Sequence, residues 1–542
     1  MPHKYTSPSD APHPFNQPSA DITLRTSNAV DFHVHTAVLS IVSPVFATMF
    51  QLPQPQQPHR EEATGTPPTR PIIEVAEDSR SLDPLLRLCY PVKKAELRTP
   101  KEIQPVLEAA IKYDMEWPTE ILTKAALDCA SSYPLGVWAT GCRLGLESVA
   151  RRGAEAYVES VQEDERKKLL YIPRITSILD EMQGISASHY YRLLNFLHSA
   201  KGVADTVLFV HAPRANGTPR SQAALDESSK REASECLPFA DDAFPSIAYP
   251  AEEVPSSDVI CRCPDGMELR AHQSILSVFS PVLKRRIAAI NAARENNQPS
   301  DSPRAIPVLE LRGRPIAVCA LLAICYHPET ELLPYGINRC IDLLAAATVY
   351  KVRHVIDLAF ARWKSLVDCD PLSSYFLAHR RGLAAAAAVA ASGTLAISGV
   401  SMQQISVLRI MDELPAWTYH VLLEYHDACS HAVSEQLDDA KTEFAIASGF
   451  GGKTPSPREA NCLYKSVSRR LNEQQEALKE RTVAPKADHV AGLRNLADVA
   501  TDIQYHKLCP VTYNLLTRLT ETLPQRIEDA IGKVKFDIEV AT

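Results

Sequence analysis

Residues 21–50 read DITLRTSNAVDFHVHTAVLSIVSPVFATMF, and residues 258–287 read DVICRCPDGMELRAHQSILSVFSPVLKRRI. The two stretches align without a gap, and each residue of the second lies 237 positions after its counterpart. A repeat at this distance, the length of a whole domain, indicates two copies of one domain rather than a solenoid of short repeats. The shared positions that define the pattern are Asp21, His35, Leu39, Ser43 and Pro44 in the first copy and Asp258, His272, Leu276, Ser280 and Pro281 in the second.

The repeat extends well beyond these stretches. Residues 72–92 match residues 308–328, and residues 134–146 match residues 371–383. Each copy reads as strand, strand, helix, helix, strand, helix and helix, because short alternating segments precede longer segments of helical periodicity. The sequence therefore predicts an α+β fold, in which each copy has a small mixed sheet, a cluster of helices and an all-helical extension.

Composition changes and the limits of the repeat divide the chain into seven segments. Pro-rich, polar composition predicts disorder at the N-terminus and in the linker between copies, where the apolar run 207–210 is a candidate for an extra strand. The predicted segments are a disordered N-terminus (1–17), a first domain (18–130), its helical extension (131–205), a linker (206–254), a second domain (255–367), its helical extension (368–447) and a mostly helical C-terminal appendage (448–542).

Composition argues against several classes of partner. The 542 residues carry a net charge of −8 and only short basic clusters, so neither nucleic acid nor a membrane surface is expected as a partner. The longest apolar runs, 315–325 and 383–391, are shorter than the ~20 residues that span a bilayer. The first twenty residues lack the apolar core of a signal peptide. We expect a cytoplasmic or nuclear protein whose 13 cysteines stay reduced.

The repeated block combines a D-x-x-x-R strand, an H-x-x-x-L-S helix, a Ser-Pro helix start and a later L-L-x-x-C-Y helix. This combination resembles the BTB/POZ domain, over residues 18–130 and 255–367. Two such copies with helical extensions are most similar to the tandem-BTB proteins of mushroom-forming, basidiomycete fungi. The resemblance implies a non-enzymatic protein–protein interaction scaffold that dimerises through its first helices and a sheet edge. A homodimer and a pairing of the two copies within one chain are both compatible with it.

The helix that follows Ser43 and Pro44 is the expected interaction surface of the first copy. It is apolar there, whereas the second copy replaces FATMF with LKRRI. We therefore expect the two domains to share a fold without sharing a partner. The interaction candidates are Val45, Phe46, Met49 and Phe50.

The recurring polar residues have structural interpretations. Ser43 and Pro44 have the order of an N-cap serine followed by proline at the first helical position. His35, at a strand-to-helix junction, is interpreted as a buried side chain that satisfies backbone groups at the helix start. Asp21 opens the first strand and is interpreted as a hydrogen-bond acceptor rather than as an acid. The second copy repeats these roles.

The resemblance also implies an alternative role, as a substrate adaptor of a cullin-type ubiquitin ligase. The hydrophobic-x-Glu motif that supports cullin binding should follow the helix that ends at Phe50. A Pro/Gln-rich stretch stands there instead, and Glu61 and Glu62 are displaced without a hydrophobic anchor. The scaffold role is therefore preferred.

A third function, nucleotide-dependent catalysis, depends on the sequence SGFGGKT at residues 448–454. A phosphate-binding loop needs a glycine five positions before the Gly-Lys-Ser/Thr triplet and a helix directly after it. Ala447 occupies the glycine position, and Pro455 and Pro457 follow the loop. A plain Gly-rich loop is therefore favoured, and no cofactor is expected.

A zinc site is the last chemical hypothesis. Its weak candidates, His426, Cys429, His506 and Cys509, are separated by long and irregular distances, unlike the regular spacing of zinc fingers. A buried cysteine more often acts as a small apolar side chain. We therefore expect no metal.

Overall fold

A computed structural model gives the structure of the chain, which forms two compact units. The first unit contains Met1–Ile185 and His189–Arg214, and the second contains Ser186–Ser188 and Ala215–Thr542. The structure describes residues 8–52, 70–160, 181–198, 208–210, 256–297, 306–328, 336–397, 408–447, 457–479, 485–486 and 510–536.

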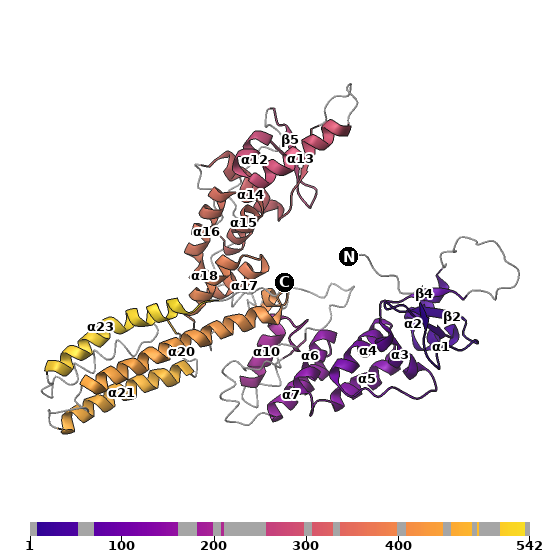
Figure 1. Cartoon of the computed structure of the whole chain (residues 1–542), viewed down its shortest axis with the longest axis horizontal. Helices are drawn as coiled ribbons and strands as arrows, with labels where there is room; N and C mark the ends of the chain where they lie inside the picture. Colours follow the sequence, from indigo (N-terminus) through magenta and orange to yellow (C-terminus); the bar gives the residue numbers. More distant parts are fainter. Residues whose placement is uncertain are drawn as a thin grey trace, which may run out of the picture. The chain divides into compact units, whose positions relative to one another are not determined.

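The first unit begins with a small sheet and its covering helices and continues into a helical extension (Figure 1). This order agrees with the predicted mixed-sheet fold. The elements are β1 (Ser9–Asp10), β2 (Ile22–Arg25), β3 (Val30–Val34), α1 (Thr36–Val42), α2 (Pro44–Gln51), β4 (Ile72–Glu74), α3 (Ser79–Cys89), α4 (Pro100–Lys112), α5 (Glu116–Asp128), α6 (Pro134–Leu144), α7 (Glu147–Ser160) and α10 (Ala187–His198).

The first sheet has the strand order β1-β3-β2-β4. β2 and β3 are antiparallel with Leu24 opposite Phe32, and β4 joins β2 in parallel with Ile73 beside Leu24. These three side chains share one face of the sheet, since alternate residues of a strand point to the same side. All three belong to the buried core of the first domain, and this apolar face fixes the register of the strands.

Residues 8–17 are ordered, so the prediction of a disordered N-terminus is wrong for them. Strand β1 pairs in parallel with β3, and the ring of Phe15 is buried with its centroid 5.7 Å from that of Phe32. Composition missed this segment because a few apolar side chains anchor an otherwise polar and Pro-rich stretch. Residues 1–7 lie outside the described part of the chain.

Helices α6 and α7 of the first extension pack at very short distance. A Cβ added to Gly141 would lie 2.2 Å from the backbone nitrogen of Ala150, and one added to Gly153 would lie 2.3 Å from that of Trp138. Both distances are far below van der Waals contact. Only glycine at these two positions therefore lets the two backbones approach this closely.

The predicted linker begins with anchored residues. Phe209 is fully buried, and the backbone N–H groups of Phe209 and Val210 donate to one carboxylate oxygen of Glu147 at 2.9 and 2.8 Å. Residues 208–210 form a bend, so the predicted extra strand is absent from them. Residues 211–254, the rest of the predicted linker, lie outside the described residues.

The second unit repeats the sheet and its helices, with strand order β6-β5-β7, and ends in long helices. Its elements are β5 (Val259–Arg262), β6 (Glu268–Ala271), α12 (Gln273–Phe279), α13 (Pro281–Asn297), β7 (Val308–Glu310), α14 (Pro315–Tyr326), α15 (Ile337–Tyr350), α16 (Arg353–Val367), α17 (Pro371–Arg380), α18 (Ala384–Thr394), α19 (Leu408–Met411), α20 (Ala416–Ala447), α21 (Pro457–Lys479) and α23 (Pro510–Lys533).

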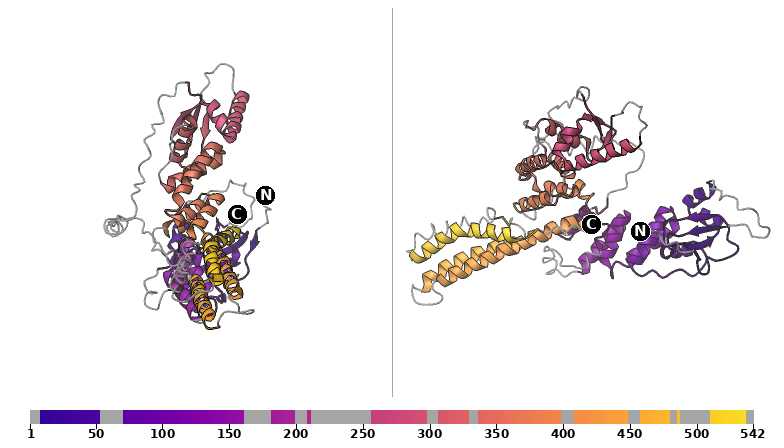
Figure 2. Two further views of the ribbon diagram at one scale, coloured as in Figure 1. Left: turned by 90° about the vertical axis from the view of Figure 1, so that its left-hand side faces the viewer. Right: turned by 45° about the horizontal axis from the view of Figure 1, so that its top comes forward.

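The C-terminal helices confirm the prediction of a mostly helical appendage. α21 and α23 lie along α20, as Figures 1 and 2 show. Leu437 and Phe444 of α20, Leu471 of α21 and Leu523 and Ile527 of α23 are buried. The three helices are therefore held together by an apolar seam of their own.

Three residues from the end of the first repeat belong to the second unit. Ser186 forms an isolated antiparallel bridge with Pro415. Beside it, the backbone N–H of Ala187 donates to the carbonyl of Leu414 at 2.8 Å. The repeat aligns Met182 with Met411, so Ser186 and Pro415 hold the same position in their respective copies. A short piece of the first copy thus completes the structure of the second unit.

A half-buried histidine in α17, whose Nε2 atom is shielded from solvent, makes the second unit sensitive to acid. The Nε2 atom of His379 has no hydrogen-bond partner among the described residues, and its ring packs edge-on against Tyr375. Burial lowers the pKa of His379 from 6.5 to about 4. The unfolded chain therefore takes up a proton below pH 6.5, whereas the folded chain does so only near pH 4. Stability is full above pH 6.5 and falls as the pH drops through this window.

We expect this histidine to cost the second unit roughly 2–3 kcal/mol between pH 6.5 and pH 4. Urea denaturation at a series of pH values measures the loss, and a His379→Phe chain should lose most of the slope. His354→Phe, which changes an exposed histidine of α16, is the matched control and should retain it. The same slope in His379→Phe and in the wild type would contradict this assignment.

Candidate interaction site

In each copy an aspartate that directly precedes a strand accepts a hydrogen bond from the backbone N–H of the first residue of the first helix. The two carboxylate oxygens of Asp21 accept from the backbone N–H of Thr36 at 2.8 Å and from its hydroxyl at 2.5 Å. Asp258 accepts from the backbone N–H of Gln273 at 2.7 Å. Although desolvation raises the pKa of Asp21, the hydrogen bonds from Thr36 bring it below its usual value. The aspartate therefore satisfies the start of the helix as a charged acceptor.

The histidines do not cap the helix, which corrects the interpretation made from the sequence. The backbone N–H of His35 donates to the hydroxyl oxygen of Tyr90 at 2.8 Å, and its Nδ1 lies 3.3 Å from the same oxygen. His272 and Tyr326 repeat the arrangement at 2.7 and 3.0 Å. The half-buried imidazole of His35 makes no side-chain cap to α1, because Asp21 already holds the first helical N–H.

A buried serine starts the second helix of each copy and ties it to a distant segment. The Oγ of Ser43 accepts from the backbone N–H of Phe46 at 3.0 Å and donates to the carbonyl of Tyr113 at 2.6 Å. Ser280 donates to the carbonyl of Tyr350 at 2.5 Å in the same way. The Ser-Pro pair therefore caps its helix and also fixes that helix against the end of α4 or α15.

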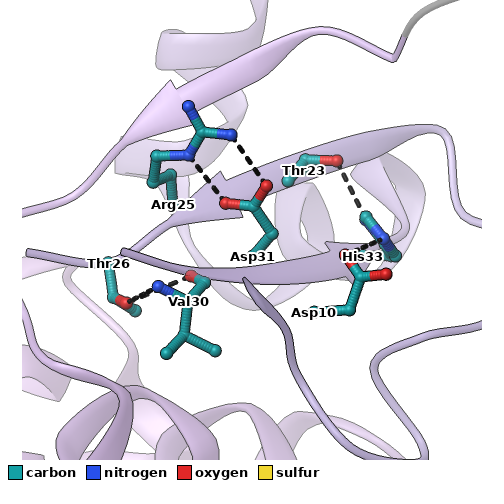
Figure 3. Close-up of polar contacts among 7 residues, drawn as sticks. All are labelled: Asp10, Thr23, Arg25, Thr26, Val30, Asp31 and His33. Atoms are coloured by element: carbon teal, nitrogen blue, oxygen red, sulfur yellow. Dashed lines mark hydrogen bonds and ion pairs between the residues drawn. The ribbon is translucent and has the colours of Figure 1, made fainter. Parts of the chain in front are cut away.

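Polar contacts on one face of the first sheet hold β1, β2 and β3 in register (Figure 3). Arg25 and Asp31 form a two-pronged ion pair with N···O distances of 2.7 and 2.8 Å, and this bond to Asp31 raises the pKa of Arg25. His33 lies 2.9 Å from the hydroxyl of Thr23 and 3.3 Å from a carboxylate oxygen of Asp10. These contacts join the edge strand to the centre of the sheet.

A comparison with protein-family models matches the BTB/POZ domain at residues 14–128 and 251–363. The chain carries two BTB/POZ domains. The matches begin a few residues earlier than predicted, and the buried Phe15 explains why the first one does. BTB domains are in general modules for protein–protein interaction and dimerisation, and they are typically non-catalytic. No curated protein matches the chain.

The four apolar residues expected to form the interaction surface of the first BTB domain face largely inward. Phe46 is fully buried, with ring centroids 4.4 Å from Tyr113 and 5.7 Å from Phe50. It is unavailable to a partner, so its prediction as an interaction residue is wrong. Val45, Met49 and Phe50 are half-buried and pack against the same core. The apolar side of α2 is turned toward its own domain.

The two most exposed large apolar residues of the BTB domains lie one helix earlier. Ile41 in α1 is 85% exposed, and Val278, at the equivalent position of α12, is 80% exposed. Leu39 and Leu276, two residues before them, are buried, because residues two apart point to different sides of a helix. An apolar residue at the same solvent-facing position of both copies is a sequence signal, and the predicted interaction residues did not include it.

The described residues contain no group of three His, Cys, Asp or Glu side chains that could hold a metal ion. The Nε2 of His426 lies 2.8 Å from the hydroxyl of Thr394, and burial raises the pKa of Cys429 to about 11, which keeps it a thiol. His506 and Cys509 lie outside the described residues, so the predicted four-residue zinc site stays an untested hypothesis.

Two further hypotheses concern segments outside the described residues. The Gly-rich loop 448–454 and the acidic pair Glu61 and Glu62 both fall there, so nucleotide binding and cullin binding remain predictions. None of the described helices is long and apolar enough to cross a membrane.

Proposed function

We propose that the protein is a non-enzymatic interaction scaffold whose BTB domains bind protein partners, the first of them through the exposed side of α1. The observation that carries the proposal is the exposure of Ile41, matched by Val278 in the second domain. A single exposed apolar residue is ordinary in a soluble domain. Exposure of an apolar residue at the same position of both copies indicates an interaction surface. Leu52, just after α2, is a further exposed apolar side chain of the first domain.

Self-association is the proposed assembly. A two-fold interface uses the same surface on both partners, and a duplicated domain supplies two such surfaces. The assembly is therefore either a homodimer or a pairing of the two BTB domains within one chain.

Replacing Ile41 with aspartate is expected to break a homodimer without unfolding the domain. An exposed substitution changes stability by no more than about 0.5 kcal/mol, whereas a buried unpaired charge costs an interface roughly 3–5 kcal/mol. Light scattering should show the mass falling from twice 59.7 kDa to 59.7 kDa. Ile111→Asp, at an exposed isoleucine of α4, is the matched control and should keep the dimer mass.

A wild-type chain that is monomeric in the same measurement would contradict the homodimer. The pairing within one chain then makes its own prediction for the double variant Ile41→Asp/Val278→Asp. Separation of the two domains should raise its radius of gyration in small-angle X-ray scattering. An unchanged radius would contradict the second assembly as well.

The finer parts of the proposal rest on the resemblance stated from the sequence. They are kinship with the tandem-BTB proteins of basidiomycete fungi and a cytoplasmic or nuclear location. Two alternative functions have direct tests. A pull-down with a cullin scaffold tests the adaptor role, and a thermal shift with millimolar ATP or GTP tests nucleotide binding by residues 448–454. A negative pull-down removes the adaptor role, and the absence of a thermal shift removes nucleotide binding.

A further inference from the structure

Residues 208–210 dock on the first helical extension through one phenylalanine. Phe209 is fully buried, whereas Leu208 beside it is 61% exposed. The ring of Phe209 packs edge-on against Phe196 of α10 with the ring centroids 5.2 Å apart, and the guanidinium of Arg151 in α7 lies 6.0 Å from the ring centroid. A single aromatic side chain therefore anchors a segment whose three described residues form neither helix nor strand.

The extension also holds the main chain of this segment. One carboxylate oxygen of Glu147 accepts from the backbone N–H groups of Phe209 and Val210 at 2.9 and 2.8 Å. The guanidinium of Arg192, a residue that is 7% exposed, donates to the carbonyl of Phe209 at 3.0 Å. Nearly every peptide offers the same main-chain groups, so the contacts of the ring decide which residue type is bound.

The second extension holds a phenylalanine at the equivalent place. The register of the repeat in this helix aligns Phe196 of α10 with Tyr425 of α20. Phe536 packs edge-on against Tyr425 with a centroid distance of 5.0 Å, close to the 5.2 Å between Phe209 and Phe196. The same ring of Phe536 lies 6.0 Å from that of Tyr375 in α17. Each extension thus holds a phenylalanine against the same aromatic position.

The two bound phenylalanines come from different places in the chain. Phe209 comes soon after α10, whereas Phe536 comes after α21 and α23, which both follow α20. Their surrounding sequences, TVLFVHA at 206–212 and KVKFDIE at 533–539, share only the pattern V-x-F. Two segments that differ in sequence and in point of attachment therefore bring the same side chain to the same position, which indicates that the position selects phenylalanine.

The first of these two sites has the additional means to bind a peptide main chain. Its Glu147 and Arg192 align with Ala384 and Val421 in the second copy. Neither alanine nor valine has a side-chain acceptor or donor, so the second copy has no counterpart of these hydrogen bonds. The first site combines a place for an aromatic ring, a main-chain acceptor and a main-chain donor, which together are typical of peptide recognition.

We propose that the first helical extension binds a short peptide segment of a partner protein that presents a phenylalanine in the pattern V-x-F. Residues 208–210 occupy the site as an internal ligand. A ligand attached to the same chain acts at an effective concentration far above that of a free peptide, so a partner has to displace it. The assignment of the ligand to a partner protein rests on the proposed scaffold function.

The test uses the full-length chain and fluorescence anisotropy. The probe is a labelled pool of peptides with V-x-F among random residues, and the control pool has alanine in place of phenylalanine. Phe209→Ala removes the internal ligand, so it should bind the V-x-F pool roughly tenfold or more tightly than the wild type does. The control pool should bind neither chain. Leu208→Ala, at the exposed neighbour, is the matched control and should bind the V-x-F pool as weakly as the wild type.

A second variant keeps the test decisive if Phe209→Ala fails to fold. Val210→Pro removes one of the two N–H groups that donate to Glu147 and leaves the residues of the site itself unchanged. It should also bind the V-x-F pool more tightly than the wild type. Adding Glu147→Gln to Phe209→Ala should reverse most of the gain in affinity, because the charged main-chain acceptor is lost. That reversal assigns the binding to this site.

An unlabelled peptide of residues 206–212 should displace the V-x-F pool from both variants. If neither the pool nor this peptide binds the variants more tightly than the wild type, the site is overturned. If the 206–212 peptide binds and the pool does not, the assignment to a partner is overturned, because the site then recognises only its own segment. The mass measurement on Ile41→Asp is independent of these results, so failure here is distinguishable from failure of the scaffold function.

Discussion

A Gly153→Ala chain is expected to lose about 3 kcal/mol of stability in its first unit, near the upper end for overpacking. The added methyl group would lie 2.3 Å from the backbone nitrogen of Trp138 and 2.8 Å from the carbonyl oxygen of Pro134. Both atoms belong to the backbone of α6, so no side chain can rotate away. Helices α6 and α7 would have to separate, and their shared apolar contacts would be lost.

Chemical denaturation followed by helical circular dichroism measures this loss. Gly532→Ala is the matched control, because Gly532 lies in helix α23 with nothing within 4 Å of an added Cβ. That control should be neutral or slightly stabilising, since alanine is the better helix former by about 1 kcal/mol. The second copy carries Ala378 and Ala390 where the first carries Gly141 and Gly153, so the second extension accommodates the methyl groups for which the first leaves no room. A loss below about 1 kcal/mol in Gly153→Ala would contradict the close packing.

A Phe46→Ala chain is expected to lose about 3–5 kcal/mol, because it leaves a cavity in the centre of the first BTB domain. Phe46 is fully buried and stacks on Tyr113 at a centroid distance of 4.4 Å. Its loss also removes packing from the helix that Ser43 caps. Denaturant titration of the full chain should show the first unit unfolding at lower denaturant, with the second unit unchanged.

Thr48→Ala is the matched control on the same helix, because Thr48 is exposed and only its hydroxyl bond to the Pro44 carbonyl is lost. It should change stability by no more than about 0.5 kcal/mol. The two substitutions at Phe46 and Ile41 then separate folding from association. Phe46→Ala should unfold the domain, and Ile41→Asp should leave it folded but unpaired. A folded Phe46→Ala chain that fails to associate would restore Phe46 as an interaction residue.

The fold followed from the sequence because its strongest signals were local or repeated. The Ser-Pro helix start, the alternating strands and the apolar helices each follow from nearest neighbours along the chain. The duplication then supported each assignment twice. The acceptor role of Asp21 followed for the same reason, since a carboxylate that opens a strand beside a helix start has backbone N–H groups within reach.

The interaction surface was less predictable, because apolar composition does not say which side of a short helix is covered. Phe46 and Ile41 are both large and apolar. The packing of α2 against Tyr113 buries Phe46, whereas Ile41 lies on a different side of α1 from the buried Leu39 and is exposed. The prediction of disorder failed at residues 8–17 for a related reason. Their order depends on pairing with β3, a strand that comes later in the chain.

The buried serine bonds have a consequence for how the two domains diverged. Ser43 and Tyr113 are 70 residues apart, and so are Ser280 and Tyr350. Within this constant span, helix α2 of the first domain has 8 residues, whereas helix α13 of the second has 17. Each domain therefore contains a stretch in which mutation can change the length of a helix while the fold is inherited unchanged.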